Sequence, residues 1–479
     1  MRHFFKPFMF ALAFACTFSF VSCGDDENEV PEPSDPTPVE PLTPSEKEAM
    51  SPEAQKQYLD KVAMDFMAQM PASDFEEIAS LGKWIADTYV DDYDWDNVED
   101  WAEDIFDAAR QALGTETTNT KTYQDGRYTE QYNYIFTNYS ALLTASNFIG
   151  HFTAKNGQWE LTPANDLQFI FPDKAGRQCI VKLETSGKEK KVHAFNIDDK
   201  TKSESSSSDD YTYIRTRYYD RTQYTVAVPE KIVVTLTQGG SQVVKTTVNI
   251  DLNSLTGEEF DISKNNITVS TTTELNNGYK IVVNQVAYTA NSKASGSCVM
   301  SKNGTNLVTV AFSGDISGIP SCNVAAFSCD DFDEDDYDWE SANGKNAFVK
   351  VDVMGKLQIQ GTISDVHKYV DYLDDADHND TEESKFKSYI NQANSLTNVF
   401  LFYDGSATKQ AEAKLEPFID ETWNGKTYWK AEPIMCFFDG SSYSTFEAFF
   451  NEEDFKKVID TFKALADNYA NLIDEKIEW

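Results

Sequence analysis

The sequence predicts an α+β protein with an N-terminal helical region, a long antiparallel β-meander and a mixed C-terminal segment. Three observations predict this order. Apolar residues recur at three- and four-residue steps over residues 45–115, which is the period of a helix. Residues 116–344 contain runs of alternating apolar and polar residues separated by Gly-containing turns, which is typical of hairpins. Residues 345–479 contain both patterns.

The composition fits one large domain or two to three ordinary ones. The chain has 479 residues, of which 41% are hydrophobic and 13% aromatic, and its formal net charge is −38. That length and hydrophobic content are enough to bury large cores. A surface with so much negative charge repels nucleic acid and favours solubility. We therefore expect no nucleic-acid partner.

Three amphipathic helices are expected in residues 45–115. Ser51 and Pro52 form a typical helix start, a capping residue followed by proline at the first helical position. The first apolar stripe ends at Pro71. A third stripe runs through Leu113, with a glycine after it as a helix end. The second helix places four apolar residues on one face: Phe75, Ile78, Leu81 and Ile85.

The central region is expected to form one meander with tight turns. Asn156-Gly157 separates two alternating runs, and Asn-Gly is a preferred two-residue hairpin turn. Residues 231–252 and 296–316 have matching sequences and predict a duplicated hairpin. The polar stretches 188–191 and 203–208 predict a mobile excursion from the strands.

A meander with this many strands must pair or cover the unpaired backbone groups of its edge strands. A barrel, a sandwich or a sheet wrapped around a helix would each do so. Helices at both ends of the chain favour a curved sheet, or half-barrel, that is covered by helices.

The C-terminal segment is expected to alternate strands and helices. Ser364 precedes an apolar stripe and is the expected cap of a helix. The expected elements are an extended stretch at 348–363, helices at 364–373 and 382–396, a hairpin at 399–415, a strand at 428–438 and a closing helix at 452–476.

The first 22 residues have the parts of an export signal. Arg2 and Lys6 precede an apolar run over residues 8–20, which is too short for a transmembrane helix. Val21-Ser22-Cys23 then resembles the lipobox of bacterial lipoproteins. The resemblance implies that residues 1–22 are removed and that Cys23 is lipidated and anchors the chain to a membrane. Several acyl chains on one residue make a stable anchor.

Residues 23–44 are expected to be an acidic and Pro-rich linker. The acidic run after Cys23 resembles the signal that directs some Gram-negative lipoproteins to the cell surface. It implies an outer-membrane, surface-facing location. Six prolines in residues 30–44 predict a semi-rigid stalk. The resemblance covers only about the first 30 residues and implies nothing about the globular part.

Five cysteines remain after the signal and the lipidated residue. An odd number leaves at least one thiol unpaired. The spacing of Cys322 and Cys329 allows a small disulfide loop in an oxidising compartment, and five unpaired thiols are the alternative. The five are Cys179, Cys298, Cys322, Cys329 and Cys436.

The sequence contains no catalytic or cofactor motif. No H-E-x-x-H, G-x-S-x-G, Walker or G-x-G-x-x-G pattern is present, so no cofactor is expected apart from calcium. Hard cations prefer several carboxylate oxygens at once. One acidic-aromatic run predicts such a calcium site, and a solvated acidic loop is the alternative. The candidate ligands are Asp331, Asp333, Asp335 and Asp336.

Aromatic residues near the C-terminal end predict a ligand site. Trp423, Tyr428 and Trp429 lie close together in the sequence, and sugar-binding surfaces stack such rings against pyranose faces. A strand with one buried face is the alternative explanation of the same pattern.

We therefore expect an outer-membrane-anchored surface lipoprotein that binds a glycan or protein ligand without catalysis. A carrier of lipid, or of another apolar ligand, on the concave face of a curved sheet is an alternative. A hydrolase is another, and it would need two carboxylates in one cleft.

Overall fold

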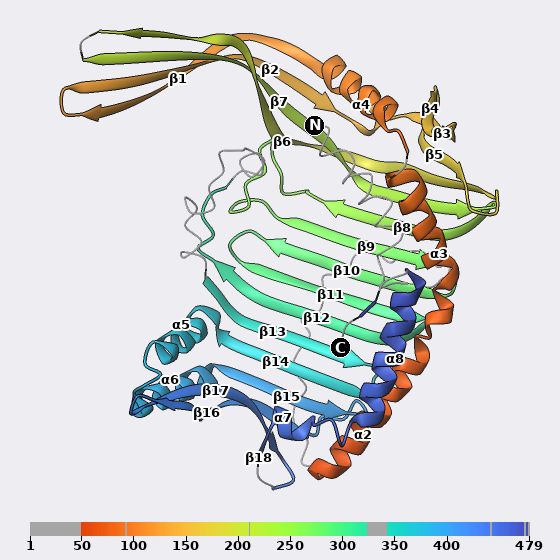
Figure 1. The fold of residues 1–479 in the computed structure, drawn as a ribbon, viewed down its shortest axis with the longest axis vertical. Coiled ribbons are helices and arrows are strands. Elements are labelled where there is room, and N and C mark those ends of the chain that lie inside the picture. The colour runs from red at the N-terminus through yellow and green to blue at the C-terminus, as the bar shows by residue number, and fades with distance from the viewer. Residues whose placement is uncertain are drawn as a thin grey trace.

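The computed structural model describes residues 49–477 except 92, 210, 323–342, 441–442 and 474–475. It confirms a strand-rich α+β chain with helices at both ends. Figure 1 shows one broad sheet with helices in front of it. The described strands are β1 (Arg110–Asp125), β2 (Tyr128–Leu143), β3 (Gly150–Lys155), β4 (Gln158–Thr162), β5 (Leu167–Pro172), β6 (Gln178–Ser208), β7 (Thr212–Gln238), β8 (Ser241–Asp251), β9 (Ile267–Leu275), β10 (Tyr279–Thr289), β11 (Lys293–Lys302), β12 (Thr305–Ser317), β13 (Asn343–Val353), β14 (Leu357–Asp365), β15 (Thr397–Tyr403), β16 (Ala411–Trp423), β17 (Lys426–Phe437) and β18 (Tyr443–Thr445).

The N-terminal helices form where their capping and apolar residues predict. The Ser51 hydroxyl accepts a hydrogen bond from the Ala54 amide at 3.3 Å and begins α2. The four apolar residues predicted on the second helix are all buried. The N-terminal elements are α2 (Pro52–Gln69), the 3-10 turn η1 (Ala72–Asp74), α3 (Glu76–Ile85), the π turn η2 (Ala86–Asp91) and α4 (Asp96–Ala109).

The third helix is shorter than predicted. It ends at Ala109, and the helical region therefore stops before residue 115. Leu113, predicted to face the core, is exposed in β1. The threonines that follow it are β-branched, and they pair with β2 instead of continuing the helix.

The sheet is a meander with two parallel exceptions. Consecutive strands from β5 to β18 pair antiparallel, whereas β2–β7 and β3–β5 are parallel. The Asn156-Gly157 turn has φ of 55° and 84°, as an Asn-Gly hairpin requires. Both halves of the duplicated pattern form hairpins, β7–β8 and β11–β12.

The prediction of a mobile excursion at residues 188–191 and 203–208 is wrong, because both stretches belong to the strand β6. The outer parts of β6 and β7 pair with β1 and β2 in the order β1-β2-β7-β6. We call residues 110–143 and 192–226 the arm, and it projects beyond the body (Figure 1). Polar residues are tolerated there because the backbone groups of β6 are paired across β7.

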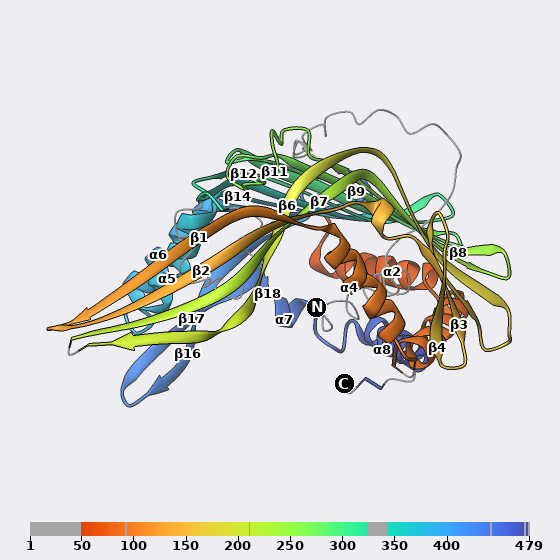
Figure 2. The ribbon, with the colours of Figure 1, turned by 90° about the horizontal axis from the view of Figure 1, so that it is seen from above.

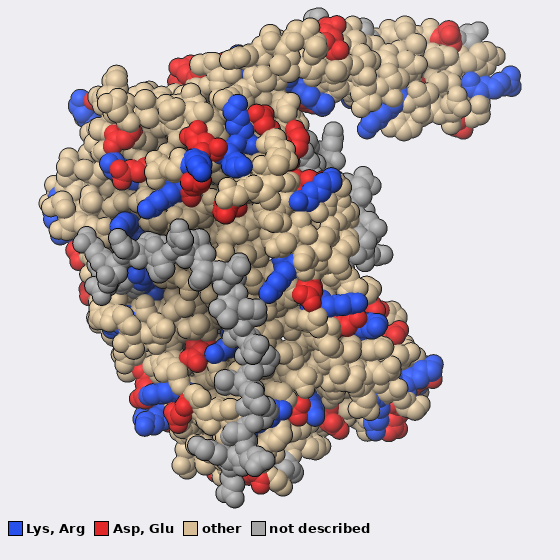
Figure 3. Space-filling model, turned by 180° about the vertical axis from the view of Figure 1, so that it is seen from behind, with Lys and Arg blue, Asp and Glu red and all other residues tan. Residues whose placement is uncertain are grey.

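The sheet is bent, and Figure 2 shows α2, α4 and α8 against its concave face. Figure 3 shows the opposite face, over which charged side chains are scattered. The largest core lies under α3 and α4 and includes Phe152 and Trp159, which are almost fully buried. A second core joins Phe75 to Tyr279 of β10, with ring centroids 4.7 Å apart.

The C-terminal segment follows the predicted order with two local differences. Asp365, and not Ser364, caps α5, by accepting a hydrogen bond from the Lys368 amide at 3.2 Å. Phe462 belongs to the apolar stripe of the closing helix, which predicts a core-facing side chain, but it is exposed. The helices are α5 (Val366–Asp377), α6 (Glu383–Leu396), α7 (Phe446–Phe449) and α8 (Lys456–Leu472).

Three of the five cysteines are unpaired in the part of the chain that the structure describes. Cys179, Cys298 and Cys436 carry free thiols. Burial raises the pKa of the Cys179 thiol to about 11, which makes it a poor nucleophile at neutral pH. Cys329 lies outside the described residues, so its pairing with Cys322 stays a prediction.

Candidate functional site

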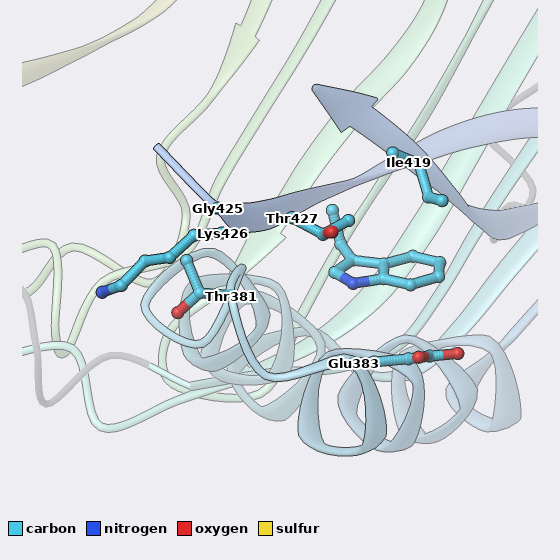
Figure 4. Close-up of a pocket in the computed structure, with 7 residues that line it drawn as sticks. Thr381, Glu383, Ile419, Gly425, Lys426 and Thr427 are labelled. Atoms are coloured by element: carbon cyan, nitrogen blue, oxygen red, sulfur yellow. The ribbon is translucent and has the colours of Figure 1, made fainter. Parts of the chain in front are cut away.

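A pocket lies between the β16–β17 hairpin and the start of α6. Its volume is about 450 Å³, within the usual range for small-ligand sites. Figure 4 shows Glu383 on the helix side and Ile419 on the strand side. The lining residues are Thr381, Glu383, Ile419, Gly425, Lys426, Thr427 and Trp429.

The hairpin positions its side chains through its turn and its register. Asn424 and Gly425 have φ of 51° and 77°, which is the conformation that two-residue hairpin turns need. Ile419 is directly opposite Trp429, and a bulge follows before Glu421. Opposite residues of an antiparallel pair lie on the same face, so Ile419 and Trp429 share the pocket side.

Trp429 is held from three directions. Its amide donates to the Asp380 carbonyl at 2.8 Å, and its ring packs against the buried cluster that includes Phe386 and Ile390. The Lys387 ammonium lies 4.5 Å from the ring centroid. Lys387 in turn binds Glu383 at 2.7 Å, one helical turn earlier. The indole therefore has a fixed position at the pocket wall, which favours preorganised binding.

The pocket combines apolar and polar groups. Ile419 is 58% exposed and offers an apolar wall beside the indole. Thr381, Thr427, Glu383 and Lys426 add hydroxyl, carboxylate and ammonium groups, which together donate and accept hydrogen bonds. One carboxylate lines this pocket, so it does not bring together the two carboxylates that the hydrolase alternative needs.

The opposite face of the hairpin is occupied by ion pairs. Lys430 lies 2.8 Å from Glu432 and 3.2 Å from Asp420. The hydrogen bonds to Glu432 and Asp420 raise the pKa of Lys430 above its ordinary value. The Lys430 ammonium and these two carboxylates are therefore paired with one another on the face away from Trp429.

The structure separates the three aromatic residues that the sequence groups together. Trp429 lines the pocket. Trp423 is 64% exposed at the end of β16 and is not a lining residue. Tyr428 precedes Trp429 in β17, so its side chain projects to the opposite face.

Sequence reasoning missed Thr381, Glu383 and Ile419. Thr381 lies two residues before α6 and Glu383 is its first residue, and no local pattern shows that this helix packs beside β17. Asp331, Asp333, Asp335, Asp336 and Cys23 lie outside the described residues. Within the described ranges, no three potential metal ligands of the His, Cys, Asp or Glu type come together.

A second surface lies on the concave side of the sheet. Val286, Phe312, Val349 and Ile359 are each between 39% and 43% exposed. We call these four residues the concave apolar surface. Phe312 shares its strand face with Val308, and Val308 packs in the core beneath α2 and α8. The surface therefore continues that core beyond the edge of the helices.

Two glycines leave space for side chains of the concave apolar surface. Gly296 pairs with Phe312 and Gly361 pairs with Val349 across the strands. A Cβ atom at Gly296 would lie 2.9 Å from the Phe312 ring, so the ring occupies the space above this glycine. A larger residue at position 296 would displace the Phe312 ring.

No helix in the described part of the chain is both long and apolar enough to span a membrane. Comparisons with protein-family models, with curated proteins and with solved structures found no match to this chain.

Proposed function

We propose that the protein is an outer-membrane-anchored, surface-exposed lipoprotein that binds a carbohydrate without catalysing a reaction. The observation that carries the binding proposal is the indole of Trp429, fixed at the wall of a pocket that also contains hydroxyl, carboxylate and ammonium groups. The location rests on the resemblance of Val21-Ser22-Cys23 to a lipobox and on the acidic run after it.

The chemistry of the pocket matches a pyranose ring. The apolar face of a sugar packs on an indole, and its hydroxyls need both donors and acceptors. Glu383 accepts, and the two threonine hydroxyls donate and accept, whereas the Lys426 side chain extends away from the indole (Figure 4). The Lys387–Glu383 ion pair holds one acceptor beside the ring. An open pocket of this size fits one or two sugar units, with a Kd of roughly micromolar to millimolar.

The first test is a glycan array probed with the full chain and three variants. Wild type is expected to retain a defined set of glycans. Trp429→Ala is expected to lose them because it removes the stacking surface. Trp423→Ala is the matched control, since that indole is exposed outside the pocket, and it is expected to bind as wild type does.

Trp429 also packs in a core, so its removal could act through folding. Thr427→Val keeps the side-chain shape and removes one hydroxyl. It is expected to weaken binding about tenfold, since one lost hydrogen bond to a ligand costs roughly 1–1.5 kcal/mol. Its melting temperature is expected to match wild type. A wild-type chain that retains no glycan, or equal binding by Trp429→Ala, would falsify the proposal.

A second candidate is an apolar ligand on the concave apolar surface. It is favoured by four apolar side chains that share one face of a bent sheet and stay partly exposed. Native mass spectrometry of the full chain, extracted gently, is expected to detect an adduct of lipid mass. Phe312→Ser should abolish the adduct. Val370→Ser should keep it, because this exposed valine lies on α5.

A further inference from the structure

One side of the arm is formed by the edge strand β1, which has no strand partner on its outer side among the described residues. β1 is exposed at 15 of its 16 residues. Among the described strands it pairs with β2 alone. Such an edge presents a row of backbone donors and acceptors and is a template for another strand.

Over residues 116–125 this edge lacks two of the usual protections. Natural edge strands carry prolines or clustered lysines that block pairing. β1 contains no proline, and its charged residues beyond its first position are Glu116, Lys121 and Asp125. Threonines, which suit strands, occupy much of the rest. They are Thr115, Thr117, Thr118, Thr120 and Thr122.

The charge of the arm differs from that of the body. The arm has eight Lys and Arg residues and nine Asp and Glu residues, against 41 and 79 in the whole chain. Two copies of the chain repel one another through their acidic bodies, but their nearly neutral arms do not. The arm also contains five of the seven arginines and ten of the 23 tyrosines, the residue types that are enriched at protein interfaces.

We propose that a second copy of this chain occupies the edge, by antiparallel pairing of the two β1 strands about a twofold axis at Asn119. This register places Thr118 opposite Thr120 of the second copy, and the reverse, which are favourable cross-strand pairs. Glu116 meets a threonine, and so does Lys121. No two like charges are opposite one another.

The proposed contact between the two β1 strands is long enough to form as many hydrogen bonds as a protein interface needs. Pairing over residues 115–123 forms roughly eight to ten backbone hydrogen bonds, about as many as a typical protein interface contains. The arm projects beyond the body (Figures 1 and 2), so two arms can meet while the bodies stay apart. The irregular register between Ala112 and Glu116 marks the inner limit of the pairing.

Disulfide trapping in the full-length, membrane-bound chain tests this register. In the proposed pairing the two Cα atoms of Asn119 are about 4.5–5.5 Å apart, within disulfide range. Asn119→Cys is expected to give a covalent dimer on mild oxidation. Thr201→Cys, exposed on the opposite edge strand of the arm, is the matched control and is expected to stay monomeric.

Charge substitutions then test whether the strands truly pair. Thr118→Lys with Thr120→Lys, added to Asn119→Cys, places lysines opposite one another and is expected to reduce the dimer roughly tenfold or more. Co-expression with the corresponding double glutamate variant is expected to restore a mixed dimer. Equal trapping at residues 119 and 201, or dimer unchanged by the lysines, would overturn the proposal.

Discussion

Asp74 connects the N-terminal helices to the meander through a single carboxylate. One of its oxygens accepts hydrogen bonds from the Tyr279 hydroxyl at 2.7 Å and the Lys302 ammonium at 2.6 Å. Burial acts to raise the pKa of Asp74, but the hydrogen bonds from Lys302 and Tyr279 outweigh it and lower the pKa below its ordinary value. The charged carboxylate is therefore the form that stabilises this contact.

Replacing Asp74 by Asn is expected to lower the free energy of unfolding by about 1–3 kcal/mol at pH 7, because a charge-assisted hydrogen bond is lost. The contribution is present above the unfolded pKa of about 3.9 and is lost as pH falls through the lower folded pKa. Urea unfolding at a series of pH values measures it. Wild type and variant should converge in acid, whereas Asp104→Asn, on the exposed side of α4, should follow wild type throughout.

At the scale of elements, α2 is tied to the sheet by one buried amide. The Gln55 side chain donates to the Gln410 and Met50 carbonyls at 3.0 Å and accepts from the Tyr403 hydroxyl at 3.1 Å. Gln55 is fully buried. A helix with a weak apolar stripe thus gains its docking geometry from a satisfied polar network.

Gln55→Leu is expected to destabilise the protein by about 2–4 kcal/mol, since it leaves a buried hydroxyl and a carbonyl unpaired. Thermal and urea unfolding measure the change. Gln57→Leu, the same substitution at an exposed position of α2, should change stability by less than about 0.5 kcal/mol. Equal effects at both positions would contradict the network.

The turn of the β16–β17 hairpin offers an element-scale test of the pocket. Gly425 has φ of 77° and open space around it, so an added methyl group acts through backbone strain alone. Gly425→Ala is expected to lower the free energy of unfolding by about 1 kcal/mol and to weaken glycan binding. Gly440→Ala introduces similar strain at a turn with φ of 83° and should leave binding unchanged.

At the scale of the molecule, local patterns predicted most elements and few of the contacts between them. Turn chemistry identified Asn156-Gly157 because that signal is local. The outer part of β6 was missed because its polar residues form a strand only when β7 lies beside it. Trp429 was identifiable as an aromatic residue in a dense cluster. Glu383 was not, since its place in the pocket depends on the packing of α6.

The most direct measurement of the central claim is a calorimetric titration of the full chain with the best-retained glycan. Binding at one site per chain is predicted for wild type and for Trp423→Ala. Trp429→Phe, which keeps an aromatic ring but reduces its area, should bind several-fold more weakly, and Trp429→Ala should give no measurable heat. Equal affinity in all four proteins, or no binding by wild type, would contradict a carbohydrate site at Trp429.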